Sequence, residues 1–192
     1  MSRFGLIVAG LIVVLLIGFA SIVRVTGPGW SGVGGGTSGP KIAATAPYSG
    51  VLLIPVQGVA ASALRDSWAD PRGDGTRMHH AIDIMAPRGT PVIAAADGRI
   101  EKLFQSRLGG TTIYERSADG GSDYYYAHLD RYAPTLVEGQ VVHAGDVIAA
   151  VGSTGDADSG APHLHFEIHR MAPGEGWWQG QEIDPYPVLA RK

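Results

Sequence analysis

Apolar residues between positions 51 and 187 occur in short stretches, many of which alternate with polar residues at every second position. A period of two is typical of β-strands, because successive side chains of a strand point to opposite faces. Turn-forming residues, chiefly Gly and Asp, separate the stretches. The predicted strands are 51–56, 82–85, 91–95, 99–104, 111–115, 123–129, 147–151 and 163–169. Only 59–64 is a weak helical candidate, so we expect an all-β domain with an antiparallel β-sheet core.

The N-terminal segment has a different pattern. Residues 4–23 contain no charged side chain and are flanked by Arg3 and Arg24. As a helix, twenty residues span about 30 Å, which matches the hydrocarbon core of a bilayer. We expect one uncleaved transmembrane helix. The alternative is a signal peptide cleaved at a small-x-small site, which Gly18 and Ala20 would supply.

Residues 25–50 are rich in Gly, Ser, Thr and Pro and carry a single charge, Lys41. A coil of this length has an end-to-end distance of about 28 Å, so we interpret it as a flexible linker. The predicted organisation is a membrane anchor or signal segment at 1–24, a linker at 25–50 and one globular domain at 51–192. We expect a single-pass protein of the cytoplasmic (inner) membrane with an extracytoplasmic, periplasmic domain, or a secreted protein if the segment is cleaved.

Composition narrows the functional classes. The 192 residues are 45% hydrophobic and 17% charged, which is enough apolar material for a packed core. The 15 basic and 18 acidic residues give a net charge of -3 without a long basic run, which argues against a nucleic-acid partner. The chain has no cysteine, which excludes disulfides, thiolate metal sites and cysteine nucleophiles.

The histidines carry the candidate chemistry, and all seven follow residue 78. In the stretch PHLHFEIH, residues 162–169, strict alternation separates an apolar face from a polar face. The apolar residues are Leu164, Phe166 and Ile168, and the polar ones are His163, His165, Glu167 and His169. An H-x-H pair above a hydrophobic face is typical of a strand that lines a metal or catalytic site.

Two further stretches add potential ligands. His79 and Asp83 lie four residues apart, where Pro87 and Gly89 downstream favour a loop that enters a strand at 82–85. Farther along, alternation places Tyr124, Tyr126 and His128 on one face of a strand. The three stretches supply one carboxylate and several imidazoles. Catalytic zinc sites have three such protein ligands and one open position, so the residues indicate metal-dependent hydrolysis.

These motifs resemble those of the lysostaphin-type, or LytM-domain, zinc metalloendopeptidases of bacterial cell walls. The matching motifs are H-x-x-x-D at 79–83, I-D-I-x-A-P-x-G-T-P-V at 82–92, Y-A-H at 126–128, G-x-T-G at 152–155 and P-H-L-H-F at 162–166. The resemblance covers about residues 52–188. It implies an antiparallel sheet of the lysostaphin/LytM-like type, which contains a duplicated hybrid motif.

The resemblance also implies residue roles. Carried over by position, His79, Asp83 and His165 bind one Zn²⁺ per domain, and His128 and His163 are catalytic histidines that handle the proton and the oxyanion. A Glu general base is usual in other zinc proteases, but in this family the role falls to histidine, so Glu167 is not expected to act as the base. We interpret His80 as a neighbour of the site only. His143 and His169 match no motif position, and we expect both on the surface.

The preferred function is a membrane-tethered zinc metalloendopeptidase that hydrolyses peptide bonds in peptidoglycan stems or cross-bridges. The alternative is a noncatalytic cell-wall module that regulates another wall hydrolase, and a structural zinc domain is a third reading. Because all five family positions are filled, we favour the enzyme. The sequence leaves open which bond is cut and whether a regulatory partner gates activity. It also leaves open whether Trp177 and Trp178 line a substrate groove or anchor a loop.

Overall fold

The computed structural model describes residues 50–73 and 75–191. The transmembrane helix expected at 1–24 and the linker up to residue 49 lie outside the described residues. Among the residues that are described, no helix is long and apolar enough to cross a membrane. The described residues belong to one compact unit.

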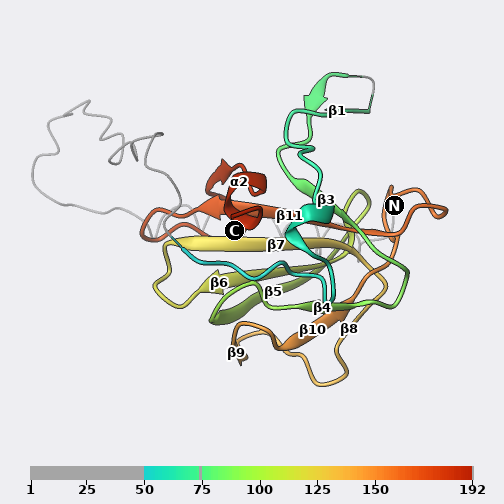
Figure 1. Ribbon diagram of the computed structural model, residues 1–192. Coiled ribbons are helices and arrows are strands. Elements are labelled where there is room, and N and C mark those ends of the chain that lie inside the picture. Colours follow the sequence, from blue (N-terminus) through green and yellow to red (C-terminus); the bar gives the residue numbers. More distant parts are fainter. Residues whose placement is uncertain (1–49, 74, 192) are drawn as a thin grey trace, which may run out of the picture. The chain divides into compact units, whose positions relative to one another are not determined.

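Antiparallel β-structure dominates this unit, as predicted (Figure 1). A seven-stranded sheet in the described part has the order β12-β11-β7-β6-β5-β9, and β3 also pairs with β11. Its strands are β3 (Ile82–Met85), β5 (Gly98–Ser106), β6 (Gly110–Ser117), β7 (Ser122–Leu129), β9 (Val141–Val142), β11 (His163–Arg170) and β12 (Gln181–Ile183). Strands β5, β6, β7 and β11 are the long ones and provide a rigid platform.

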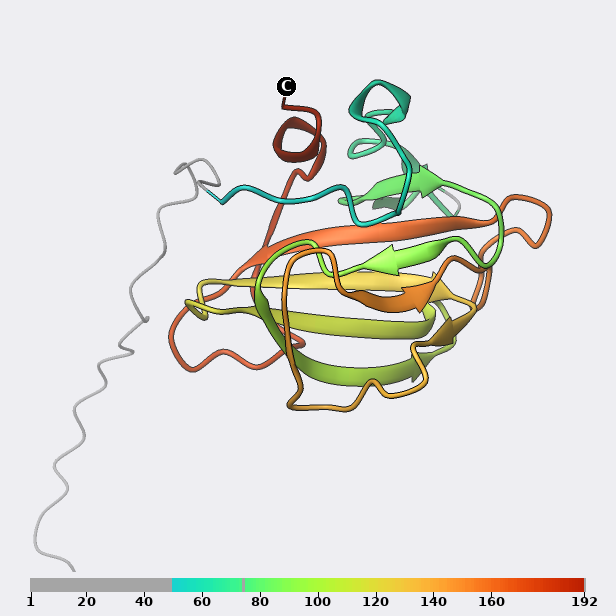
Figure 2. The ribbon, with the colours of Figure 1, turned by 60° about the horizontal axis from the view of Figure 1, so that its bottom comes forward.

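Two smaller groups of strands complete the fold. A three-stranded sheet has the order β4-β10-β8. Its strands are β4 (Pro91–Ile93), β10 (Val147–Ala150) and β8 (Arg131–Tyr132). A separate hairpin pairs β1 (Pro71–Arg72) with β2 (Arg77–Met78). Figure 2 shows the short helix α2 (Tyr186–Leu189) near the same edge of the large sheet as the 3-10 turn η1 (Ala61–Ala63).

The core confirms the period-two pattern of residues 163–169. Leu164, Phe166 and Ile168 are fully buried and pack in one cluster with side chains of both sheets, among them Val92 and Ile148. Because alternate residues of a strand face opposite ways, burial of these three directs His163, His165 and Glu167 to the other face of β11. The hydrophobic core thereby sets the orientation of the polar side chains.

The predicted strand at 51–56 is wrong. This segment is extended but forms only an isolated bridge, Val56 with Val92, and single hydrogen bonds such as Leu53 N to Ala95 O. Pro55 has no N–H, so it cannot donate to a continuous ladder. The helical candidate at 59–64 is reduced to η1, one short turn.

Strand β7 departs from the predicted alternation at His128. Between Thr111 and Ile113 of β6 there is one residue, whereas two residues of β7, Ala127 and His128, lie opposite it, which is a β-bulge. His128 also has a positive φ of 59°. Tyr124 and Tyr126 are buried in the core, whereas His128 lines a pocket on the opposite side. The prediction that these three side chains share a face is therefore wrong, because the bulge redirects His128.

Candidate metal centre and active site

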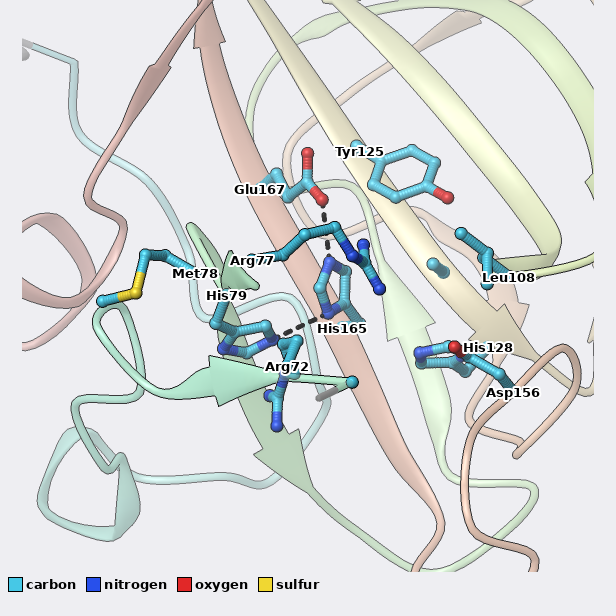
Figure 3. Close-up of a pocket in the computed structure, with 13 residues that line it drawn as sticks. Arg72, Arg77, Met78, His79, Leu108, Tyr125, His128, Asp156, His165 and Glu167 are labelled. Carbon is cyan, nitrogen blue, oxygen red and sulfur yellow. Dashed lines mark hydrogen bonds and ion pairs between the residues drawn. The ribbon is translucent and has the colours of Figure 1, made fainter. Parts of the chain in front are cut away.

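Three potential ligands converge where the paired strands β3 and β11 meet the segment after β2. His79 follows β2, Asp83 lies on β3, and His165 lies on β11 directly opposite Asp83. Nε2 of His79 is 3.0 Å from Oδ1 of Asp83 and 2.9 Å from Nδ1 of His165. Nδ1 of His165 is 3.2 Å from the same Asp83 oxygen. The structure thus brings the predicted ligand set together at one point. Figure 3 shows two of its members, His79 and His165, with the contact between their rings.

Hydrogen bonds on the far side of each ring determine which nitrogen faces this point. His79 donates from Nδ1 to the backbone oxygen of Ser67 at 2.9 Å. His165 donates from Nε2 to Oε1 of Glu167 at 2.8 Å. A neutral imidazole has only one N–H, so the lone pairs of His79 Nε2 and His165 Nδ1 point toward the Asp83 carboxylate.

The three atoms fit a divalent metal. A tetrahedral metal with ligand bonds of about 2.1 Å separates its ligand atoms by about 3.4 Å, close to the spacing found here. Two imidazoles and one carboxylate form a donor set that suits zinc and leaves a position open. When both rings are neutral and no metal is bound, the lone pairs of His79 Nε2, His165 Nδ1 and the Asp83 carboxylate face one another with no proton between them. The residues therefore fit a metal site on their own geometry.

Protonation competes with a metal at the same atoms. Burial would lower the pKa of His165, but its hydrogen bonds to Asp83 and Glu167 raise that pKa to about 9. Burial would likewise raise the pKa of Asp83, yet His165 and His79 hold it well below its usual range. Arg72 of β1 contacts the other oxygen of this carboxylate, Oδ2. In the metal-free chain a proton on His165 therefore takes the place of a cation.

His128 and His163 stand beside the ligand set. His128 donates from Nδ1 to the backbone oxygen of Thr154, and His163 donates from Nδ1 to that of Ala161, each at 2.8 Å. Their ring centroids are 5.0 Å apart, and Nε2 of His163 is 3.7 Å from Oδ1 of Asp83. Burial lowers the pKa of His128, with a further contribution from its histidine neighbours. A neutral His128 has its lone pair on Nε2, which can accept a proton.

The loop at residues 152–155 holds His128 in place and needs its glycines. A Cβ on Gly155, whose φ is +79°, would lie 2.0 Å from the backbone oxygen of Leu108. A Cβ on Gly152 would lie 2.4 Å from the backbone nitrogen of Asp130. Thr154, between them, accepts from His128 and donates from Oγ1 to Leu129 O at 2.8 Å. The G-x-T-G motif therefore has a physical reason, since only glycine permits this close approach.

Glu167 and His169 extend the site behind His165. Glu167 accepts from His165 through Oε1 and from His169 Nε2 through Oε2, both at 2.8 Å. Burial opposes ionisation, but these imidazoles outweigh it and lower the pKa of Glu167 to about 2. The His169 side chain is only 13% exposed, so the prediction of a surface residue is wrong. The chain beside β12 covers it, because Gly180 packs against its Cβ. His143, in contrast, is exposed as predicted.

A pocket of about 300 Å³ opens beside these groups. It is lined by His79, His165 and Glu167 on one side and by Tyr125 and His128 on another. Two arginines of the β1–β2 hairpin, Met78, Leu108 and Asp156 are also part of the lining (Figure 3). His79 and His165 of the ligand set and the neighbouring His128 are therefore reached from this pocket.

Several contributing residues had no sequence signal. Ser67 is 2% exposed; its backbone oxygen orients His79, and its Oγ accepts from the backbone N–H of Asp83 at 3.1 Å. Backbone-mediated contacts of this kind do not depend on a recognisable side-chain pattern.

His80 contacts Trp68 and Glu182, which makes it a neighbour of the site, as interpreted. Trp177 packs against Tyr114 with ring centroids 4.8 Å apart, whereas Trp178 is 68% exposed.

Comparison with known proteins gives concordant matches. The model of peptidase family M23 matches residues 77–185. The L-Ala–D-Glu endopeptidase of Bacillus subtilis is 36% identical over 131 residues, covering 65% of this chain and 39% of that protein. The DD-carboxypeptidase/endopeptidase Mpg of Neisseria meningitidis serogroup B is 46% identical over 114 residues, which are 58% of this chain and 23% of that protein. The chain thus spans well under half the length of these two relatives.

Among solved structures, the catalytic domain of the antimicrobial peptidase lysostaphin from Staphylococcus simulans superposes with a TM-score of 0.55 at 33% identity. The match covers 66% of this chain and 90% of that domain. The fold expected from the sequence motifs is therefore confirmed: mostly antiparallel β-sheet of the lysostaphin/LytM type.

Proposed function

Since the chain belongs to peptidase family M23, a family of metallopeptidases, we propose that it is a zinc endopeptidase that cleaves peptidoglycan stems or cross-bridges. The observation that carries the proposal is the convergence of His79, Asp83 and His165 beside two further histidines. The relatives described above are named as peptidases. One is an L-Ala–D-Glu endopeptidase and another is a DD-carboxypeptidase/endopeptidase. Their whole-length activities supply candidates for the bond cut by this chain.

We assign His79, Asp83 and His165 as the zinc ligands. When bound there, zinc supplies Lewis acidity toward the scissile carbonyl and toward water. Ser67 and Glu167 fix the two ligand imidazoles in the tautomers that present a lone pair to the metal. Arg72 neutralises the carboxylate oxygen that faces away from the other ligand atoms.

His128 and His163 are the candidate catalytic residues. Each has its Nδ1–H engaged by a backbone oxygen, so Nε2 is available to the substrate. His128 has a lowered pKa and is neutral near pH 7, which suits acceptance of a proton from the attacking water. His163 shares the strand face of His165 and presents Nε2 to the same space, where it stabilises the developing oxyanion when protonated.

The apolar segment at 4–23 and the linker at 25–50 support a location outside the cytoplasm. We propose a single-pass anchor in the cytoplasmic membrane with residues 51–192 on the wall side, so that the membrane and peptidoglycan are the two partners. Secretion after cleavage is the alternative. Fractionation followed by N-terminal sequencing of the mature protein distinguishes them, because an anchored chain stays with the membrane and retains residues 1–24.

The central experiment treats purified peptidoglycan with the full-length chain of determined zinc content, with and without a chelator. We expect new amino termini that disappear with the chelator, and the fragment masses identify the bond. Stoichiometric zinc with no release from any wall type would contradict the proposal. That outcome would favour a noncatalytic module that regulates another wall hydrolase.

A further inference from the structure

Two arginines occupy facing positions on the β1–β2 hairpin. Arg72 and Arg77 are direct cross-strand partners, so their side chains leave the same face of the hairpin. Both line the pocket that also contains His79, His165 and His128. Figure 3 shows the side chain of Arg77 reaching from the hairpin across this pocket. Arg77 is also only two residues before the proposed ligand His79, which places its charge beside the reacting centre.

The two side chains differ in their partners. Arg72 contacts Oδ2 of Asp83, so its charge is compensated within the protein. Arg77 is an exposed side chain, and among residues 50–73 and 75–191 it has no hydrogen-bond or ion-pair partner. Within those residues, no group competes with a ligand for its five N–H donors.

The arrangement is unfavourable for the hairpin alone. Like charges at directly opposite positions of an antiparallel pair destabilise it. The hairpin is short, and a Cβ at Gly73 or Gly75 would meet no atom within 4 Å, so packing at its tip contributes little. The ion pair of Arg72 with Asp83 relieves part of this repulsion, and a ligand carboxylate on Arg77 would relieve the rest.

The pocket holds charged groups of both signs. Both arginines come from the hairpin, and the two carboxylates of the lining are Asp156 and Glu167. Glu167 already accepts hydrogen bonds from His165 and His169. A cation at the ligand set would share the charge of Asp83 and make the hairpin wall more positive. A guanidinium in such a place matches the two oxygens of a carboxylate better than it matches a neutral amide.

We propose that Arg77 is a specificity-determining residue that binds a carboxylate of the substrate next to the scissile bond. This inference rests on the proposed peptidase function and narrows it: acidic stem peptides are preferred over uncharged bridges such as oligoglycine. Arg72 has a different role, because it holds the ligand Asp83. The carboxylate can be internal to the stem or at its C-terminus, and the experiment separates the two sources.

The experiment measures peptide binding by calorimetry with the zinc-loaded full-length chain. The ligands are a stem peptide with all carboxylates free, two forms in which either the internal or the terminal carboxylate is a carboxamide, and pentaglycine. Mass spectra after each titration verify that the peptide is intact. For a peptide that the chain cleaves, preference is measured as the ratio of kcat/KM values instead of the ratio of affinities. Arg77→Gln removes the charge, and Arg77→Lys keeps the charge but removes the guanidinium fork.

For the unmodified chain we expect the free-acid peptide to bind about 10- to 100-fold more tightly than one of the two amidated forms, because charge-assisted hydrogen bonds have this strength. In Arg77→Gln that ratio falls to about 1, and Arg77→Lys gives an intermediate ratio. The control is Arg99→Gln, an exposed arginine of β5 outside the pocket, which keeps the full ratio. Whichever amide abolishes the preference identifies the source of the carboxylate.

Two results would overturn the inference. One is an unmodified chain that binds acid and amide forms equally, and the other is an Arg77→Gln variant that retains the preference for the acid. Both results are read from the ratio between acid and amide forms, whether it is a ratio of affinities or of kcat/KM values. A chain that cuts no peptidoglycan yet shows the Arg77-dependent preference would instead contradict the proposed function alone.

Discussion

His165 and Asp83 lie directly opposite each other on the antiparallel strands β11 and β3, with Nδ1 of the histidine 3.2 Å from Oδ1 of the aspartate. This register joins two motifs that are 82 residues apart in the chain. A slip of one residue would turn His165 toward the core and Leu164 toward the pocket. The buried apolar face of β11 opposes such a slip, so the same packing that stabilises the sheet also aligns the ligands.

Replacing Asp83 by alanine should abolish metal binding. The change removes the only carboxylate of the ligand set and leaves Arg72 without its partner, so we expect zinc affinity to fall by at least about 100-fold. Competition with a chromophoric chelator measures the affinity. The exposed Asp146→Ala serves as the matched control and should bind zinc normally.

Replacing His163 or His128 by alanine should separate metal binding from hydrolysis. Neither belongs to the ligand set, so zinc content should remain near one per chain while the hydrolytic rate falls by about 10²- to 10⁴-fold. The exposed His143→Ala should leave both unchanged. The assignment of roles would be refuted if His163→Ala lost zinc while Asp83→Ala remained fully loaded.

Glu167 should tune the metal affinity through His165. Glu167→Ala removes the acceptor of the His165 Nε2–H, and we expect zinc to bind about 10- to 100-fold more weakly. Glu167→Gln keeps an oxygen at this position but not the charge, so its loss should be smaller. A Co²⁺-substituted chain provides a second measurement, because the visible spectrum reports the ligand geometry. Equal zinc affinity in all three proteins would contradict a positioning role.

The buried carboxylate Glu115 should make stability depend on pH. It is fully buried beside Tyr126, and burial raises its pKa to about 8. Between its ordinary pKa near 4.5 and about 8, the folded chain binds a proton that the unfolded chain has lost. The unfolding free energy therefore falls as the pH rises through this window. We expect a loss on the order of 3 kcal/mol from this group.

Urea unfolding of the metal-free chain at pH 5 and pH 8.5 tests this expectation. Glu115→Gln cannot ionise, so its unfolding free energy should decline less over the same interval. The ligand residues titrate equally in both proteins, and the difference between them isolates Glu115. Parallel pH profiles for the two proteins would show that the carboxyl does not take up a proton on folding.

Gly155→Ala should impair hydrolysis without removing zinc. The added Cβ collides with the backbone oxygen of Leu108 at a positive φ, which displaces the loop whose Thr154 oxygen orients His128. The φ strain alone is worth about 1–3 kcal/mol. Gly120→Ala is the matched control, since Gly120 also has a positive φ but its Cβ would meet no atom within 4 Å. Thermal unfolding and activity should separate the two, with activity lost only in Gly155→Ala.

The local pattern of apolar and polar residues was sufficient to predict most of the β-strands and the face of β11 that is buried. Burial of Leu164, Phe166 and Ile168 follows from a period of two, which depends only on strand geometry. The family resemblance brought together His79, Asp83, His128, His163 and His165 as one candidate site. These residues indicated metal-dependent hydrolysis because a group of imidazoles and one carboxylate, in a chain without cysteine, has few other functions.

Tertiary structure decided what depends on contacts between distant segments. Alternation placed His128 on the face of Tyr124 and Tyr126, but a bulge against β6 turned it into the pocket. His169 is largely covered because the segment next to β12 packs over it. Residues 51–56 did not become a strand because Pro55 interrupts the ladder. The sequence by itself determined which groups are present and which faces are apolar. Register, bulges and loop packing determined which of these groups meet, because such contacts depend on residues far apart in the chain.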